Sequence, residues 1–148
     1  MTAIFVQIAR NKIFLTVLCS WIIAQALKVI VGFFIQKKLD FRWFVGTGGM
    51  PSSHTAGASC LATAIGLSYG FDSVHFALAA SFAIVVMFDA QGVRRATGRQ
   101  ARILNKIMDD IYWKGKIQEG QLRELIGHTP IEVIAGFFLG IIIALIAH

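Results

Sequence analysis

Two histidines stand in the polar passages of a very apolar chain, each beside residues suited to binding an anion. His54 ends the stretch Gly-Gly-Met-Pro-Ser-Ser-His at 48–54, and His128 begins the stretch His-Thr-Pro-Ile-Glu at 128–132. Imidazole exchanges a proton near neutral pH, and its neutral form is a nucleophile. Two such groups at one site could divide attack and proton transfer between them.

The serines before His54 predict an anion site. Ser52 or Ser53 is placed to cap a helix that continues into the apolar run from Thr55. Free backbone N–H groups and the positive end of the helix dipole would then face the polar side, where they favour an anion. The alternative is an ordinary capped helix after a turn, with His54 at the membrane interface.

Glu132 has two possible roles beside His128. Thr129-Pro130-Ile131-Glu132 fits a capping box with proline at the first helical position, and this alone accounts for the glutamate. Glu132 also stands four residues after His128, close enough to hold one imidazole nitrogen. A carboxylate in that position fixes the tautomer and makes the other nitrogen a better nucleophile or base.

Cationic side chains near the apolar runs are candidates to bind phosphate oxygens. Lys28 lies inside an apolar run, where an ionisable residue is a functional candidate by default, although its long side chain could instead extend to the membrane surface. Arg94 and Arg95 follow Asp89 at the end of another run, and the planar guanidinium suits phosphate. The alternative is that these arginines only anchor the chain at a cytoplasmic surface.

The elements that must position these residues are membrane helices. The chain is 56% hydrophobic and 15% charged, with mean hydropathy +0.68, so we predict a single all-α domain over residues 1–148, an integral membrane helical bundle. About four transmembrane helices are expected, together with an amphipathic helix at 98–117 within the segment 89–129. The four apolar runs cover 13–35, 55–71, 74–88 (extendable to 91) and 131–147.

Smaller features complete this prediction. Asp72 is a candidate cap for the third run. Gly136 and Gly140 form a GxxxG face for close helix packing, which also allows a homodimer. Cys19 and Cys60 lie in apolar runs and are expected to be buried thiols, with neither a disulfide framework nor a zinc site.

Alternating spans would gather the polar segments 36–54 and 89–129 at one membrane face, with the turn at 72–73 and both termini at the other. Most of the 14 lysines and arginines fall in these two segments, which places their face in the cytoplasm by the positive-inside rule. The net charge is +6, and for a membrane chain the expected partners are anionic lipid headgroups or a phosphorylated lipid substrate rather than nucleic acid.

The motifs resemble those of the type 2 phosphatidic acid phosphatases, relatives of bacterial acid phosphatases and vanadium haloperoxidases. Pro-Ser-Ser-His at 51–54 resembles the family's P-S-G-H motif, and Gly-His-Thr-Pro-Ile-Glu-Val at 127–133 resembles the end of its S-R-x5-H-x3-D motif. Together with Asp-Ala-Gln-Gly-Val-Arg-Arg at 89–95, they are similar to the divergent bacterial branch. The resemblance covers most of the chain, from Lys28 to Gly140.

This resemblance implies a phosphatase of the bacterial cytoplasmic membrane that needs no metal or other cofactor. Its substrate would be a lipid phosphate monoester or a prenyl pyrophosphate, hydrolysed through a phosphohistidine. His128 would be the nucleophile, oriented by Glu132 where the family has aspartate, and His54 the general acid. The phosphate-binding residues would be Ser52, the backbone at Ser53 (glycine in the family), Lys28, Arg42, and Arg94 or Arg95, with Arg123 as a competing candidate for the last arginine.

Two alternatives stay open at this point. A non-catalytic membrane protein could bind or move phosphorylated lipids with the same cations, but it would have no need of a histidine pair. A structural helical bundle with basic anchors would need neither a phosphate-binding site nor a histidine pair. The identity of the lipid also stays open among phosphatidylglycerol phosphate, phosphatidate and prenyl phosphates.

Overall fold

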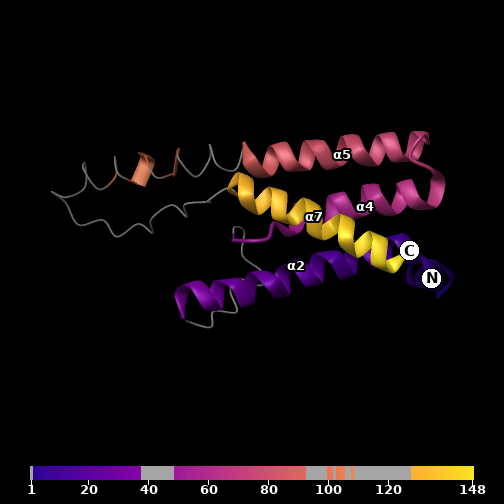
Figure 1. The fold of residues 1–148 in the computed structure, drawn as a ribbon, viewed down its shortest axis with the longest axis horizontal. Coiled ribbons are helices and arrows are strands. Elements are labelled where there is room, and N and C mark those ends of the chain that lie inside the picture. Colours follow the sequence, from indigo (N-terminus) through magenta and orange to yellow (C-terminus); the bar gives the residue numbers. More distant parts are fainter. Residues whose placement is uncertain (1, 38–48, 93–99, 102, 106–107, 109–127) are drawn as a thin grey trace.

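The computed structural model describes residues 2–37, 49–92, 100–101, 103–105, 108 and 128–148 (Figure 1). Its described elements are all α-helices, and no strand occurs among these residues. The predicted all-α class is therefore confirmed. The helices are α1 (Thr2–Arg10), α2 (Lys12–Gln36), α4 (Ser53–Tyr69), α5 (Val74–Gln91) and α7 (Pro130–Ala147).

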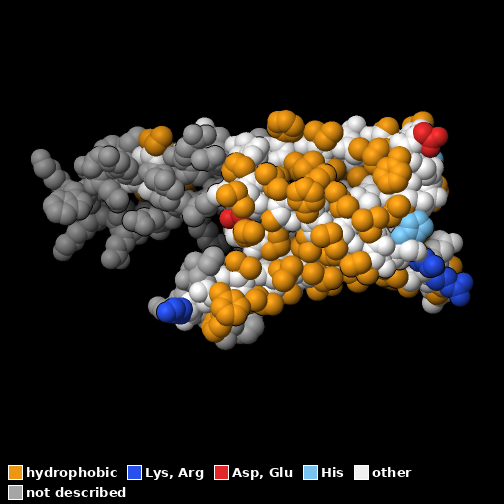
Figure 2. Space-filling model, viewed as in Figure 1, with side chains coloured by type: hydrophobic (Ala, Val, Ile, Leu, Met, Phe, Trp, Pro, Cys, Tyr) orange, Lys and Arg blue, Asp and Glu red, His pale blue; other side chains and the backbone are white. Residues whose placement is uncertain are grey.

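Three described helices, α2, α5 and α7, are long and apolar enough to cross a bilayer. On the face that Figure 2 shows, hydrophobic side chains cover most of the described helical part, and the lysine and arginine side chains in view lie at its two ends. Helix α4 has 17 residues, of which ten are buried, and it packs against α2, α5 and α7. Because protein covers α4, its small residues do not need to be strongly apolar, and a fourth crossing by this helix stays a prediction.

The helices α2, α4 and α5 alternate in direction, and α7 runs parallel to α4 (Figure 1). The turn between α4 and α5 lies at the same end of the bundle as both chain termini. The starts of α4 and α7 lie with the end of α5 towards the other end. For the described residues, this is the arrangement that alternating spans predict.

Two features of the ends differ from the sequence prediction. Ser73, not Asp72, caps α5, because its hydroxyl oxygen accepts a hydrogen bond from the N–H of Phe76 at 3.1 Å. Helix α1 was not predicted, and its exposed residues include Ile4 and Phe5. The predicted amphipathic helix at 98–117 lies mostly outside the described residues, although residues 100–101, 103–105 and 108 are helical.

Small residues bring α4 and α7 into close contact. A Cβ atom at Gly136 would meet the carbonyl oxygen of Ser52, and one at Gly140 would meet the carbonyl oxygen of Ala56 and the hydroxyl of Ser59. The predicted GxxxG packing face is therefore used inside the chain. These two glycines are buried against α4 and are not available to pair two copies of the protein.

Helix α2 packs antiparallel against α4 and also contacts α7. The Ser20 hydroxyl donates to the carbonyl oxygen of Ala56 at 3.2 Å, and the Cys60 thiol donates to the carbonyl oxygen of Thr16 at 3.7 Å. Cys60 is buried as predicted, but Cys19 is exposed and the prediction for it was wrong. Cys19 lies on an exposed face of α2, where lipid would cover it.

The α4–α7 contact predicts that a single added methyl group is destabilising at Gly140. In Gly140→Ala, the new Cβ atom would press on backbone atoms that cannot move aside, and we expect a loss of about 1–3 kcal/mol in the free energy of unfolding. Gly57→Ala is the matched control, because its Cβ would lie an ordinary 4.0 Å from Val17 Cγ1. Thermal unfolding in detergent measures both, and equal melting temperatures would contradict this packing.

Candidate active site

The start of α4 provides a buried hydroxyl and a helix N-terminus. Ser52 is the N-cap, and its Oγ accepts hydrogen bonds from the N–H and the hydroxyl of Thr55 at 3.4 and 3.1 Å. Ser52 and Ser53 are both fully buried. The Ser53 hydroxyl has no hydrogen-bond partner among the described residues, so it is available to a ligand at the positive end of the helix.

The start of α7 gives Glu132 both of its predicted roles. Its Oε2 atom accepts hydrogen bonds from Nδ1 of His128 and from the N–H of Thr129, each at 3.0 Å. The Thr129 hydroxyl oxygen accepts from the N–H of Glu132 at 3.4 Å, which completes the capping box. Because an ionised carboxylate only accepts, Nδ1 of His128 carries the proton and Nε2 keeps its lone pair.

Two backbone hydrogen bonds join these helix ends. The N–H of Ser52 donates to the carbonyl oxygen of Glu132 at 3.0 Å, and the N–H of His128 donates to the carbonyl oxygen of Ala90 at 3.2 Å. The start of α4, the end of α5 and the start of α7 therefore meet at one place. There the rings of His54 and His128 have their centres 6.5 Å apart and are inclined at 57°.

The two histidines differ in exposure. His128 is only 2% exposed, whereas His54 is exposed. A buried imidazole held by a carboxylate has a fixed orientation, which suits a nucleophile. An imidazole in contact with solvent can exchange its proton, which suits a general acid and base.

Lys28 reaches the same place from α2. Its side chain is 4% exposed, and its stem lies beside Gly49, where a Cβ atom would come within 3.1 Å of Lys28 Cγ. Gly49 has φ +86°, a conformation that other residues rarely adopt, so glycine serves both the turn and the lysine. Lys28 interacts electrostatically with Glu132. The lysine side chain is thus buried within the protein.

The predicted arginines Arg42, Arg94, Arg95 and Arg123 lie outside the described residues. Arg94 and Arg95 follow closely in the sequence after Ala90, whose carbonyl oxygen binds the N–H of His128. Over the part of the chain that is described, no three His, Cys, Asp or Glu side chains are gathered to hold a metal ion.

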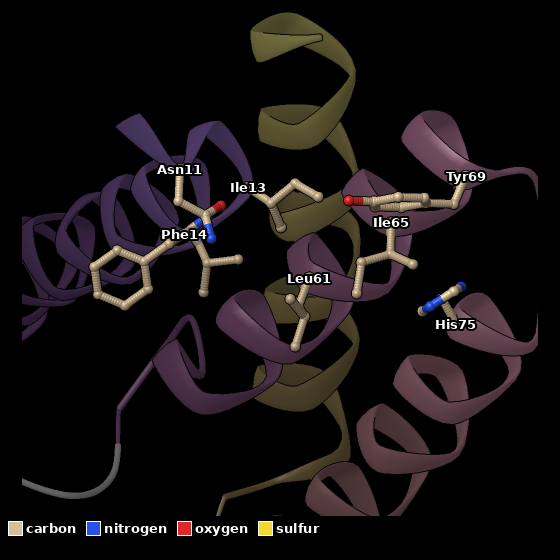
Figure 3. A pocket seen from close by; sticks show the side chains of 8 residues that line it. Asn11, Ile13, Phe14, Leu61, Ile65, Tyr69 and His75 are labelled. Atoms are coloured by element: carbon tan, nitrogen blue, oxygen red, sulfur yellow. The ribbon is translucent and has the colours of Figure 1, made fainter. Parts of the chain in front are cut away.

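A cavity of about 470 Å³ lies at the other end of the bundle, between α2, α4 and α5 (Figure 3). Leu61 and Ile65 of α4 line it together with Tyr69 and with His75 of α5. The cavity exists because α2 and α5 each pack on α4 but, over their described residues, not on each other. It contains none of the predicted site residues, so the meeting point of the two histidines is the better candidate for chemistry.

Comparison with known proteins adds independent information. The model of the divergent PAP2 family, which takes its name from the type 2 phosphatidic acid phosphatases, matches residues 9–143. The chain is 41% identical over 151 residues to YuiD of Bacillus subtilis (strain 168), described as an uncharacterized membrane protein; the match covers 95% of this chain and 96% of that one. No solved structure matches.

Proposed function

This chain belongs to the divergent PAP2 family and is an integral membrane protein, and from this membership we propose that it is a lipid phosphate phosphatase. Its substrate would be a lipid phosphate monoester or a prenyl pyrophosphate, hydrolysed through a phosphohistidine. The observation that carries the proposal is the buried His128, which Glu132 holds at Nδ1 and whose ring centre lies 6.5 Å from that of His54.

In the first step, the lone pair on Nε2 of His128 attacks phosphorus. The P–N bond forms as the bond from phosphorus to the lipid oxygen breaks, and protonated His54 gives its proton to the leaving oxygen. The released lipid is an alcohol, or a monophosphate if the substrate is a pyrophosphate. Reacting atoms approach within about 3–3.5 Å before such a step, and two rings with centres 6.5 Å apart are near enough to act on the same phosphoryl group.

In the second step, water replaces the histidine. Neutral His54 takes a proton from the water as its oxygen bonds to phosphorus, and the P–N bond breaks to return the electron pair to Nε2 of His128. Inorganic phosphate leaves, and both histidines are restored to their starting protonation states. The same side chain thus serves as acid and then as base.

Fixed positive charge stabilises the phosphoryl oxygens in both steps. The ammonium of Lys28 and the N-terminus of α4 at Ser52 and Ser53 supply it without reorganisation. Arg42 and either Arg94 or Arg95 are proposed to add bidentate contacts. The charged face is proposed to be cytoplasmic, because most of the lysines and arginines fall in the segments that join α2 to α4 and α5 to α7.

The alternative is a membrane protein that binds or moves phosphorylated lipids without hydrolysing them. Lys28 and the start of α4 would serve this function equally well. The hydrogen bond from His128 to Glu132 favours catalysis, because simple binding does not require an imidazole whose tautomer is fixed by a carboxylate.

The nucleophile is tested by His128→Ala. We expect phosphate release from a lipid phosphate to fall by roughly 10³-fold or more, because alanine cannot form the covalent intermediate proposed at His128. His75→Ala is the control, since His75 is exposed at the other end of the bundle and should keep full activity. A brief incubation with ³²P-labelled substrate should label the unmodified chain at His128 only. Full activity of a folded His128→Ala protein would exclude the mechanism.

The two roles of Glu132 are separated by a pair of variants. Glu132→Gln keeps an oxygen for the N–H of Thr129 but can present an N–H to His128, which disfavours the reactive tautomer. We expect a loss of roughly 10²–10⁴-fold in kcat with little change in stability. Thr129→Ala removes only the cap and should cost about 1 kcal/mol in stability while leaving kcat nearly unchanged. Equal effects of both variants on kcat would argue that Glu132 is only a cap.

Sidedness is tested by cysteine labelling in sealed vesicles, in a background without Cys19 and Cys60. A cysteine replacing Gly115, in the basic segment, should react with a membrane-impermeant maleimide from the cytoplasmic side only. A cysteine replacing Asp72, exposed in the turn before α5, should react from the other side only. Reaction of both from the same side would contradict the proposed topology.

A further inference from the structure

Gln25 is a buried amide that the phosphatase motifs do not account for. It lies in the membrane helix α2, is only 5% exposed, and its Oε1 atom has no hydrogen-bond partner among the described residues. A polar group buried without a hydrogen bond is costly, and bulk water does not reach the interior of a bilayer. Its burial therefore indicates that some group donates to this oxygen when the protein functions.

Gln25 lies one helical turn from the candidate site. It precedes Lys28 by three residues, so the two share a face of α2, and Gln25 is about 4.5 Å deeper in the membrane. The contacts of Ser20 with Ala56 and of Lys28 with Gly49 fix the register of α2 on α4. In that register, Gln25 is level with residues 51–53, where the Ser53 hydroxyl also lacks a partner among the described residues.

The depth of Gln25 indicates which part of a substrate would meet it. A phosphoryl group bound between Lys28 and the histidines lies nearer the membrane surface, and the rest of a lipid extends towards the bilayer centre. The first carbons of the leaving alcohol are then at the depth of Gln25. A carbonyl oxygen can only accept, so its partner must be a donor, which a hydrocarbon chain or an ester does not provide.

We propose, resting on the proposed function, that Oε1 of Gln25 accepts a hydrogen bond from a substrate hydroxyl next to the carbon that carries the phosphate. The substrate class is then a lipid with a phosphorylated, hydroxyl-bearing glycerol unit. Lipids that carry phosphate directly on a hydrocarbon chain leave this oxygen unsatisfied. A site built to bind a hydroxyl discriminates strongly against analogues that lack it.

The test uses two lipids that differ only in this hydroxyl: 1-acylglycerol 3-phosphate and its 2-deoxy analogue. Their affinities are measured by native mass spectrometry of the full chain in nanodiscs, with His128→Ala present throughout to prevent turnover. We expect the hydroxyl-bearing lipid to bind about tenfold more tightly. Adding Gln25→Met, a residue of similar length without the amide, should remove this preference by weakening the binding of that lipid alone.

Ser20→Ala is the matched control, because Ser20 is another buried polar residue of α2 that donates to Ala56 within the protein. It should keep the preference even if it lowers stability. Three results would overturn the proposal: equal binding of the two lipids, an equal loss of binding for both in Gln25→Met, or no binding of either lipid. If a trapped water satisfies Gln25 instead, the two lipids should bind equally. If the unmodified chain releases no phosphate but the hydroxyl-bearing lipid still binds more tightly, only the phosphatase activity is refuted.

Discussion

The close approach of α4 and α7 determines the rest of the candidate site. Gly136 and Gly140 leave no room for a Cβ atom, so the backbones of the two helices come into direct contact. That contact brings the N–H of Ser52 to the carbonyl oxygen of Glu132 and aligns the two helix starts. Between membrane helices there is little hydrophobic driving force, so tight packing of small residues and hydrogen bonds must provide the association.

Several polar groups in this packed framework support one another. A single oxygen of Glu132 caps α7 and holds the imidazole of His128, while the charge of Lys28 acts on the same carboxylate. Breaking one member of a buried charged set leaves the others uncompensated, which is costly in a low-dielectric interior. The orientation of His128 and the cap of α7 therefore meet at one carboxylate oxygen, although different hydrogen bonds carry the two roles.

Much of this arrangement could be predicted from the sequence, because strong local signals specify it. The helix bounds, the capping box at Thr129 and the packing role of Gly140 all follow from short-range patterns. The exposure of Cys19 could not be predicted, because apolar residues occur all around α2. Hydropathy therefore does not show which side of the helix faces lipid and which faces protein. Asp72 and Ser73 are both good caps, and the turn geometry selects the serine. Gln25 interrupts its apolar run visibly, but only its burial and register give it a role.

The hydrogen bond between His128 and Ala90 has an evolutionary consequence. It joins the end of α5 to the start of α7, and the segment between these two helices is the longest that connects described helices. The entropy cost of closing a loop rises only slowly with its length. Insertions, deletions and exchanges within this segment need not move the ends that meet at His128. Related proteins can therefore diversify in this segment, outside the proposed phosphate-binding arginines, and acquire new contacts with lipids or partners while His128 stays in place.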